Sequence, residues 1–207
     1  MQSKEWLKMR IARFEERTSV EGPGERSALW LQGCSIKCPD CCNPEMHDQC
    51  AGEEICINTL AKKIISAHAD GLTILGGEPL DQAVELIQLL QQLAEAAYHG
   101  IILFSGYEWH SITADLTKRR ATSLCDLVVA GPFDKKQTPS SRRWIGSENQ
   151  TTHFITDFYA GLQKDWPQNM REIEIFIKDN VIMVNGTPLS SEDELSLIFA
   201  PNRENRT

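Results

Sequence analysis

The stretch S-A-L-W-L-Q-G-C-S-I-K-C-P-D-C, residues 27–41, joins an apolar run to three closely spaced cysteines. The run at residues 27–32 predicts a buried β-strand, and the cysteines follow directly at its C-terminal end. The C-x3-C-x2-C spacing of Cys34, Cys38 and Cys41 lets one loop offer three thiolates and leave a fourth ligand position open. We therefore expect the rest of the chain to serve as a frame for this loop.

The composition is that of a globular domain without a basic surface. The chain has 207 residues, enough for one full-sized core, so a single domain is the default. A formal net charge of -8 argues against the clustered Lys and Arg of a phosphate-binding surface. The N-terminal residues lack the pattern of a secretory leader, and no run of about 18 apolar residues occurs. We expect a cytoplasmic protein that binds neither nucleic acid nor membranes.

The cysteines indicate metal or redox chemistry. There are seven of them, and an odd count in a reducing compartment argues against a disulfide scaffold. Structural zinc normally takes four protein ligands in two separated pairs, and no second pair completes the loop. An iron–sulfur cluster held by three thiolates leaves one iron free for a small molecule, and the spacing favours this interpretation over zinc or packed thiols. Tight C-x2-C spacing is absent from the other cysteines, so we expect free thiols rather than a second cluster at Cys42, Cys50, Cys56 and Cys125.

Strand and helix patterns alternate along most of the chain. Short apolar runs predict strands at residues 7–11, 27–32, 72–75, 101–104 and 126–130. Between them, helical periodicity predicts helices at about 58–70, 80–98 and 109–120, the second with Val84, Ile87, Leu90 and Leu93 on one side. This alternation predicts an α/β fold with a mainly parallel sheet, and our preferred architecture is a partial (β/α)6 barrel.

Four loops are expected at one edge of this sheet, because the C-terminal ends of parallel strands meet there. They are the cysteine loop and residues 76–79, 105–107 and 131–133. The second of these loops, Gly-Gly-Glu-Pro, offers glycines that let a ligand approach the backbone and a carboxylate that can bind an ammonium group. The same four residues also suit an ordinary strand-to-helix turn with Pro79 at the first helical position.

The C-terminal region has a different pattern. Alternating residues at 173–177 and 181–184 predict a β-hairpin, and a capping box at Ser191 and Glu194 predicts a short last helix ending near residue 199. Residues 202–207 are expected to form a disordered tail. We thus expect one domain over residues 1–207, with a core at about 9–155 and an extension at about 156–201.

The cysteine loop and the Gly-Gly-Glu turn together resemble the radical S-adenosylmethionine (SAM) enzymes. More narrowly, the chain is similar to the activases of glycyl-radical enzymes over about residues 9–155. The segments that carry this likeness, in order, are G-P-G-E-R at 22–26, residues 32–43, residues 76–80, S-G-Y at 105–107, residues 126–133 and G-S-E-N-Q at 146–150.

The resemblance assigns a role to each matching position. It makes Cys34, Cys38 and Cys41 the ligands of one [4Fe-4S] cluster. It implies that the turn made of Gly76, Gly77, Glu78 and Pro79 binds the methionine amino end of SAM, and that three further polar residues line the SAM pocket: Ser105, Ser147 and Asn149. No catalytic side chain is implied beyond the cluster and SAM. The chain departs from the family at Asp40, where an aromatic residue near adenine is common, and at Cys42, where activases usually carry Tyr or His.

The function implied by the resemblance is radical generation. A flavodoxin-like or ferredoxin-like donor would supply one electron, SAM would be cleaved to a 5'-deoxyadenosyl radical, and that radical would take a hydrogen atom from a glycine of a partner glycyl-radical enzyme. One alternative is a radical SAM enzyme that modifies a ribosomal peptide or a small molecule. Another, of a different class, is a non-catalytic iron–sulfur electron carrier or sensor.

Overall fold

The computed structural model describes residues 7–170, 172–178 and 181–187. Its chain forms two compact units, Met1–Met170 and Arg171–Thr207. The first unit contains every segment that carries the sequence motifs. The expected single domain with a C-terminal extension stays a prediction.

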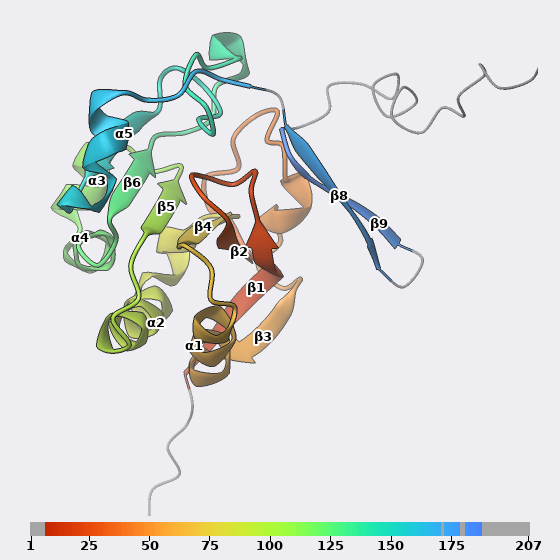
Figure 1. Cartoon of the computed structure of the whole chain (residues 1–207), viewed down its shortest axis with the longest axis vertical. Coiled ribbons are helices and arrows are strands. Elements are labelled where there is room, and N and C mark those ends of the chain that lie inside the picture. The colour runs from red at the N-terminus through yellow and green to blue at the C-terminus, as the bar shows by residue number, and fades with distance from the viewer. Residues whose placement is uncertain (1–6, 171, 179–180, 188–207) are drawn as a thin grey trace, which may run out of the picture. The chain divides into compact units, whose positions relative to one another are not determined.

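The first unit is built on a seven-stranded mixed sheet with the order β3-β1-β2-β4-β5-β6-β7 (Figure 1). Four of its strands are parallel: β2 (Arg26–Leu31), β4 (Leu72–Gly76), β5 (Ile101–Ser105) and β6 (Leu127–Ala130). Antiparallel strands extend both sides: β1 (Lys8–Thr18), β3 (Glu53–Cys56) and β7 (Thr151–Phe154).

Helices make the crossovers between the parallel strands. The first is α1 (Ile57–Ser66), the second is α2 (Ala83–Glu95), and α3 (Trp109–Ala114) with α4 (Leu116–Thr122) makes the third. A short α5 (Ala160–Lys164) follows β7. Four 3-10 turns complete the unit: η1 (Pro44–His47), η2 (Pro79–Gln82), η3 (Lys135–Gln137) and η4 (Asp157–Tyr159). None of the helices in the described ranges is long and apolar enough to cross a membrane.

The main core lies between the sheet and the crossover helices. Leucines of β2 and β4 pack there against Leu60 and Ile64 of α1 and against Leu86 and Leu90 of α2, all fully buried. The remaining face of β5 and β6 is covered by residues that follow β7, including Tyr159 and Trp166. Burial on both faces explains why the parallel strands are continuous apolar runs in the sequence.

The expected mixed α/β architecture is confirmed, with two corrections to the helices. The helix expected at 80–98 starts with the turn η2, and its core side is formed by Ala83, Leu86, Leu90 and Leu93, whereas Val84 is 56% exposed. The helix expected at 109–120 is two helices, because Asp115 adopts an extended conformation and its carboxylate accepts the N–H groups of Thr117 and Lys118, which starts α4 anew.

The second unit contains the expected hairpin. Strands β8 (Ile173–Lys178) and β9 (Val181–Gly186) pair antiparallel, with Ile175 opposite Val184. The expected last helix at 191–199 and the expected disordered tail at 202–207 lie outside the described residues.

Arg26 holds the beginning of β2 to its neighbours from a fully buried position. Its guanidinium donates to Thr73 Oγ1 at 2.6 Å, to the Gly100 carbonyl at 2.8 Å, to the Pro23 carbonyl at 2.9 Å and to Tyr159 Oη at 3.1 Å. These bonds join the turn before β2 to β4, to the start of β5 and to the segment after β7. Arg26 is therefore a structural residue that bonds loop carbonyls.

Replacing Arg26 by Ala should lower the free energy of unfolding by about 3–5 kcal/mol, because several buried acceptors lose their donor and a large side chain leaves a cavity. Replacing Arg26 by Lys should restore little of this stability, because a single ammonium group cannot reproduce the planar set of guanidinium donors. Urea unfolding at constant temperature measures the effect. Arg17→Ala is the control: Arg17 pairs with Glu25 on the surface, and its loss should change stability little. Equal stability of R26A and R17A would contradict this role.

Candidate cluster and SAM site

The cysteine loop begins where β2 ends and forms a tight turn. Cys34 is 7% exposed, Cys38 and Cys41 are partly buried, and all seven cysteines are free thiols. Two residues between the ligands, Lys37 and Asp40, have φ angles of 51° and 58°, so the backbone turns sharply after each. The loop thus presents its three thiols from a tight turn at the edge of the sheet.

The backbone of the loop directs N–H groups at the thiol sulfurs. The N–H of Lys37 points at Cys34 Sγ at 3.5 Å, and the N–H of Asn43 points at Cys41 Sγ at 3.4 Å. Such N–H···S bonds stabilise thiolates that carry the negative charge of an iron–sulfur cluster. Within the described ranges, no three His, Cys, Asp or Glu side chains are placed to hold a single metal ion. The N–H groups directed at Cys34 and Cys41 are the geometric feature of the loop that suits thiolate ligands.

The thiols of the loop differ in their electrostatics. Burial raises the pKa of Cys34. The pKa of Cys41 is lowered, first by a hydrogen bond from the neighbouring Cys42 thiol, then by the N–H of Asn43 and by His47, while burial acts in the opposite direction. The same pairing raises the pKa of Cys42. The thiols of Cys41 and Cys42 thus interact directly with each other.

The 3-10 turn η1 clamps the start of the loop. The N–H of Gly33 donates to the Met46 carbonyl at 2.9 Å, and the N–H of Cys34 donates to the His47 carbonyl at 3.3 Å. Gln32 adds two side-chain bonds, from Nε2 to the carbonyls of Glu45 and Asp48. Residues after the third cysteine therefore fix the position of the first.

The Gly-Gly-Glu turn lies directly against the cysteine loop. The N–H of Gly77 donates to the Leu31 carbonyl and the N–H of Glu78 donates to the Gly33 carbonyl, both at 2.8 Å. A Cβ on Gly77 would lie 2.2 Å from the Gly33 carbonyl oxygen, and one on Gly76, whose φ is +111°, would lie 2.5 Å from the Leu31 nitrogen. Both glycines are thus required by the contact between the two segments, independently of any ligand.

Glu78 is the centre of a buried hydrogen-bond network and is only 1% exposed. Its Oε1 accepts the Leu80 N–H at 2.8 Å and the Ser105 hydroxyl at 2.9 Å, and its Oε2 accepts the Gly106 N–H at 2.7 Å. Burial nevertheless raises the pKa of Glu78 to about 7, since these bonds only partly offset the desolvation of the charge. A cation placed beside this carboxylate would favour its ionised form.

The predicted pocket residues Ser105, Ser147 and Asn149 lie on two neighbouring loops. The Ser105 hydroxyl donates to the Glu78 carboxylate and accepts the N–H of Tyr107. Ser147 Oγ accepts the N–H of Asp134 at 3.1 Å. Asn149 Nδ2 donates to the Pro132 carbonyl at 2.7 Å, whereas its Oδ1 is shielded from solvent and has no partner among the described residues. Asn149 Oδ1 is therefore an acceptor available to a bound group.

Hydrogen bonds also join the loops after β5 and β6, where Gly131 N–H donates to the Ser105 carbonyl at 3.0 Å. The cysteine loop, the Gly-Gly-Glu turn and the loops after β5 and β6 thus follow one another along one edge of the sheet. This placement confirms the expectation from the alternating strands and helices.

Asp81 is a site residue that the sequence did not reveal. Its carboxylate accepts the Ser35 N–H at 2.7 Å, the Ser35 hydroxyl at 2.8 Å and the Tyr107 hydroxyl at 2.8 Å. Asp81 thereby ties the residue next to Cys34 to the loop after β5. A single acidic residue in a turn carries no sequence signal for such a role.

The two departures from the family pattern, Asp40 and Cys42, are exposed residues of the loop. Asp40 is exposed and forms an ion pair with Lys135, whose Nζ is 3.1 Å from Oδ1. This pair joins the cysteine loop to the segment after β6. Because both side chains are more than half exposed, the pair adds little to stability.

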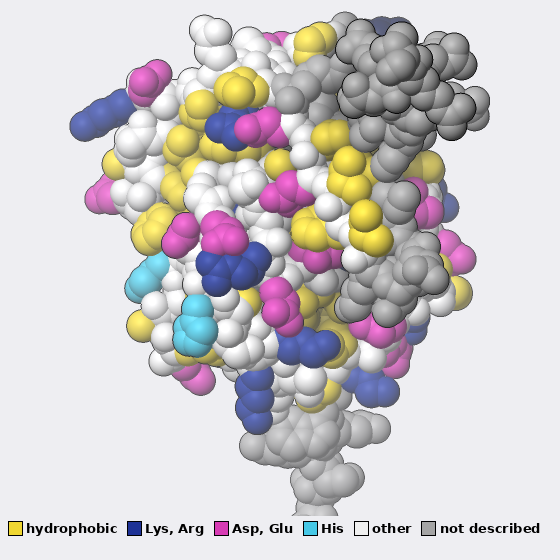
Figure 2. Space-filling view, turned by 45° about the vertical axis from the view of Figure 1, so that its right-hand side comes forward, with side chains coloured by type: hydrophobic (Ala, Val, Ile, Leu, Met, Phe, Trp, Pro, Cys, Tyr) yellow, Lys and Arg dark blue, Asp and Glu magenta, His cyan; other side chains and the backbone are white. Residues whose placement is uncertain are grey.

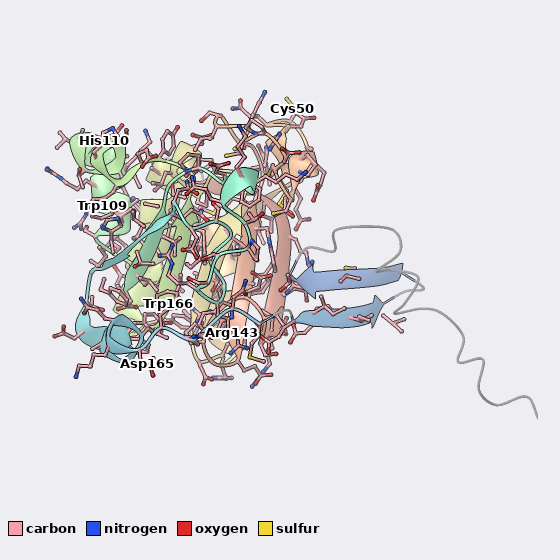
Figure 3. The ribbon with its side chains drawn as sticks, turned by 90° about the horizontal axis from the view of Figure 1, so that it is seen from above. Cys50, Trp109, His110, Arg143, Asp165 and Trp166 are labelled. Atoms are coloured by element: carbon pink, nitrogen blue, oxygen red, sulfur yellow. The ribbon has the colours of Figure 1, made fainter. Side chains whose placement is uncertain are left out.

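The other cysteines lie in different surroundings. Cys50 is exposed and lies at the periphery of the molecule (Figure 3), whereas Cys125 is buried in the core. That Cys42, Cys50, Cys56 and Cys125 bind no second cluster stays a prediction. On the face shown in Figure 2, Lys and Arg side chains alternate with Asp and Glu and form no continuous basic patch.

Comparison with known protein families agrees with this arrangement. Residues 20–153 match the family model described as a 4Fe-4S single cluster domain, which covers both the cysteine loop and the Gly-Gly-Glu turn.

Several curated relatives are similar to large parts of the chain. The anaerobic ribonucleoside-triphosphate reductase-activating protein of Enterobacteria phage T4 is 31% identical over 144 residues, which are 67% of this chain and 89% of the relative. The protein of that name from Escherichia coli K12 is 29% identical over 146 residues, 66% of this chain and 92% of the relative. The pyruvate formate-lyase-activating enzyme of Clostridium pasteurianum is 34% identical over 104 residues, 47% of this chain and 44% of the relative. The chain belongs to the 4Fe-4S single-cluster family and, within it, to the radical SAM enzymes that activate glycyl-radical enzymes.

Proposed function

We propose that this protein is an activase that uses one [4Fe-4S] cluster and SAM to take a hydrogen atom from a glycine of a partner glycyl-radical enzyme. The observation that carries the proposal is the direct backbone contact between the cysteine loop and the Gly-Gly-Glu turn, through Gly77 and Glu78. A cluster on the loop and a SAM molecule on the turn would be neighbours. We further propose that the sheet curves as a partial (β/α)6 barrel around this edge.

In this proposal Cys34, Cys38 and Cys41 hold the cluster and leave one iron open. When bound and reduced by one electron, the cluster supplies the reductive cleavage of SAM that yields the 5'-deoxyadenosyl radical. The turn of Gly76, Gly77, Glu78 and Pro79 holds the methionine amino end, and the polar residues Ser105, Ser147 and Asn149 line the pocket. For the first two of these polar residues the support is their position, and for Asn149 it is the free Oδ1 acceptor.

The protein contributes position rather than acid–base chemistry. Hydrogen-atom transfer requires no general base, so the absence of a proposed catalytic side chain is consistent with the reaction. The bonds of Glu78 and Asp81 fix the loop, the turn and the segment after β5 relative to one another. Such fixed geometry favours one hydrogen over all others within reach of the radical.

The names of the relatives support a proposal for the partner. The relatives are named as activating proteins of anaerobic ribonucleoside-triphosphate reductase and of pyruvate formate-lyase. We propose a partner of this glycyl-radical type, and a flavodoxin-like or ferredoxin-like protein as the one-electron donor.

The buried carboxylate of Glu78 should make SAM binding depend on pH. Its pKa of about 7 means that the ligand-free site is mostly protonated at pH 6 and mostly ionised at pH 7.5, and only the ionised form attracts an ammonium group. SAM affinity should therefore rise about fivefold to tenfold between pH 6 and pH 7.5. Calorimetric titration of the reconstituted protein measures this rise. Glu78→Gln should bind weakly with no pH dependence, whereas Glu95→Gln, at the exposed end of α2, should behave like the wild type.

The proposed function is tested with the reduced protein, SAM and a candidate glycyl-radical enzyme under anaerobic conditions. Electron paramagnetic resonance (EPR) should show a glycyl radical in the partner, and a partner deuterated at the glycine Cα should deliver deuterium to 5'-deoxyadenosine. Deuterium arriving from a labelled peptide or metabolite, with no glycyl signal in any candidate partner, would refute the activase assignment.

A further inference from the structure

His47 lies at the end of η1 and contacts the cluster loop at two points. Its backbone carbonyl accepts the N–H of Cys34 at 3.3 Å, which holds the first ligand in place. Its side chain interacts with the thiol of Cys41, the third proposed ligand. The side chain is partly buried.

The ring of His47 has an unused polar atom. Its Nε2 is shielded from solvent and has no hydrogen-bond partner in the described part of the chain. A buried polar group without a partner is destabilising, which makes an unfilled position here informative. The nearby sulfur of Cys41 is the acceptor that cluster binding would turn into a permanent thiolate, because metal ligation removes the thiol proton.

We propose that His47 donates its ring N–H to the Cys41 thiolate of the bound cluster and thereby raises the reduction potential of that cluster. The inference rests on the proposed function only in requiring a [4Fe-4S] cluster on the three cysteines. Reduction adds one negative charge to the cluster and its thiolates, and a donor aimed at a ligand sulfur stabilises this reduced form more than the oxidised one. His47 is thus a positioning and tuning residue that acts through Cys41.

The bond needs an N–H on the ring nitrogen that faces Cys41. The imidazolium carries an N–H on each nitrogen, and the neutral ring carries one there in one of its two tautomers. The bond adds to the N–H of Asn43, which points at the same sulfur at 3.4 Å, and to the thiol of Cys42. The backbone N–H cannot be removed by substitution, whereas the side chains of Cys42 and His47 can be.

Three variants of the full-length reconstituted protein test the inference. His47→Phe keeps a flat ring but removes the donor, and His47→Gln keeps an N–H near the position of Nε2. His110→Gln is the matched control, because His110 is exposed on α3 at the periphery of the molecule (Figure 3) and its ring bonds only to Ser111 Oγ among the described residues. The measurement is a redox titration of the cluster followed by EPR, without SAM.

The midpoint potential of H47F should shift to a more negative value, while H47Q and H110Q should stay near the wild type. An unchanged potential in H47F at full iron content would overturn the inference. If H47F does not retain a cluster, pulsed EPR on the wild type labelled with 15N-histidine gives a second test. A nitrogen weakly coupled to the cluster, whose signal disappears in H47Q, supports the inference. The absence of any such coupling in the wild type refutes it. None of these measurements uses SAM cleavage, so a failure of the proposed activity would be recorded separately.

Discussion

Replacing Cys34, Cys38 or Cys41 by Ala should abolish the cluster and, with it, all formation of 5'-deoxyadenosine. In the proposed site each thiolate would bind a different iron, and a site with only three protein ligands has none in reserve. Iron and sulfide analysis after anaerobic reconstitution, together with the visible absorption of the cluster, measures the loss. Fold is checked by circular dichroism, which should be unchanged for C38A and C41A, because their side chains lie outside the core.

Two other cysteines supply the controls. Cys50→Ala removes an exposed thiol and Cys56→Ala a partly buried one, and both variants should keep a full cluster and full activity. Retention of four irons in any of the three ligand variants would contradict the assignment, and so would loss of the cluster in C50A.

Gly77→Ala should be nearly as damaging, although the residue ligates nothing. The new Cβ would lie 2.2 Å from the Gly33 carbonyl oxygen and 2.9 Å from the Met46 carbonyl oxygen, both backbone atoms that cannot rotate away. The turn must move away from the cysteine loop and lose the bond from Glu78 N–H to Gly33. We expect a loss of about 1–3 kcal/mol in the free energy of unfolding and a drop in SAM-dependent product of at least tenfold.

The matched control for this change is Gly161→Ala. Gly161 lies in α5, where a Cβ would meet no atom within 4 Å, so the substitution should be neutral or stabilise by about 0.5–1 kcal/mol. Urea unfolding and product assays on both variants give the comparison. Wild-type activity and stability in G77A would show that the turn does not need its close contact with the loop.

Much of the architecture could be predicted because it depends on local patterns. The apolar runs of β2, β4, β5 and β6 are buried on both faces, which gives an unambiguous strand signal between helical segments. The strands β3 and β7 were missed for the opposite reason. Each has only four residues, and both include polar or charged side chains, so only pairing with a neighbour makes them strands.

The sequence likewise predicts one part of the candidate site and not the other. The cysteine loop and the Gly-Gly-Glu turn are each contiguous in sequence, and their order was enough to place them at one edge. The hydrogen bonds that fix the structure around them join residues far apart in the sequence. Asp81 bonds to Ser35, 46 residues away, and Arg26 bonds to Tyr159, 133 residues away. No local pattern predicts which polar residue will be buried beside which loop, so Asp81 and His47 required the structure.

The central claim, that the cysteine loop and the Gly-Gly-Glu turn form one cluster and SAM site, has a direct test. Protein reconstituted with iron and sulfide is reduced with dithionite under anaerobic conditions, SAM is added, and 5'-deoxyadenosine is quantified against the amount of cluster. Formation of 5'-deoxyadenosine by the wild type, with none from Cys41→Ala and little from Glu78→Gln, is the predicted result. An intact, reducible four-iron cluster that forms no 5'-deoxyadenosine from SAM would contradict the claim.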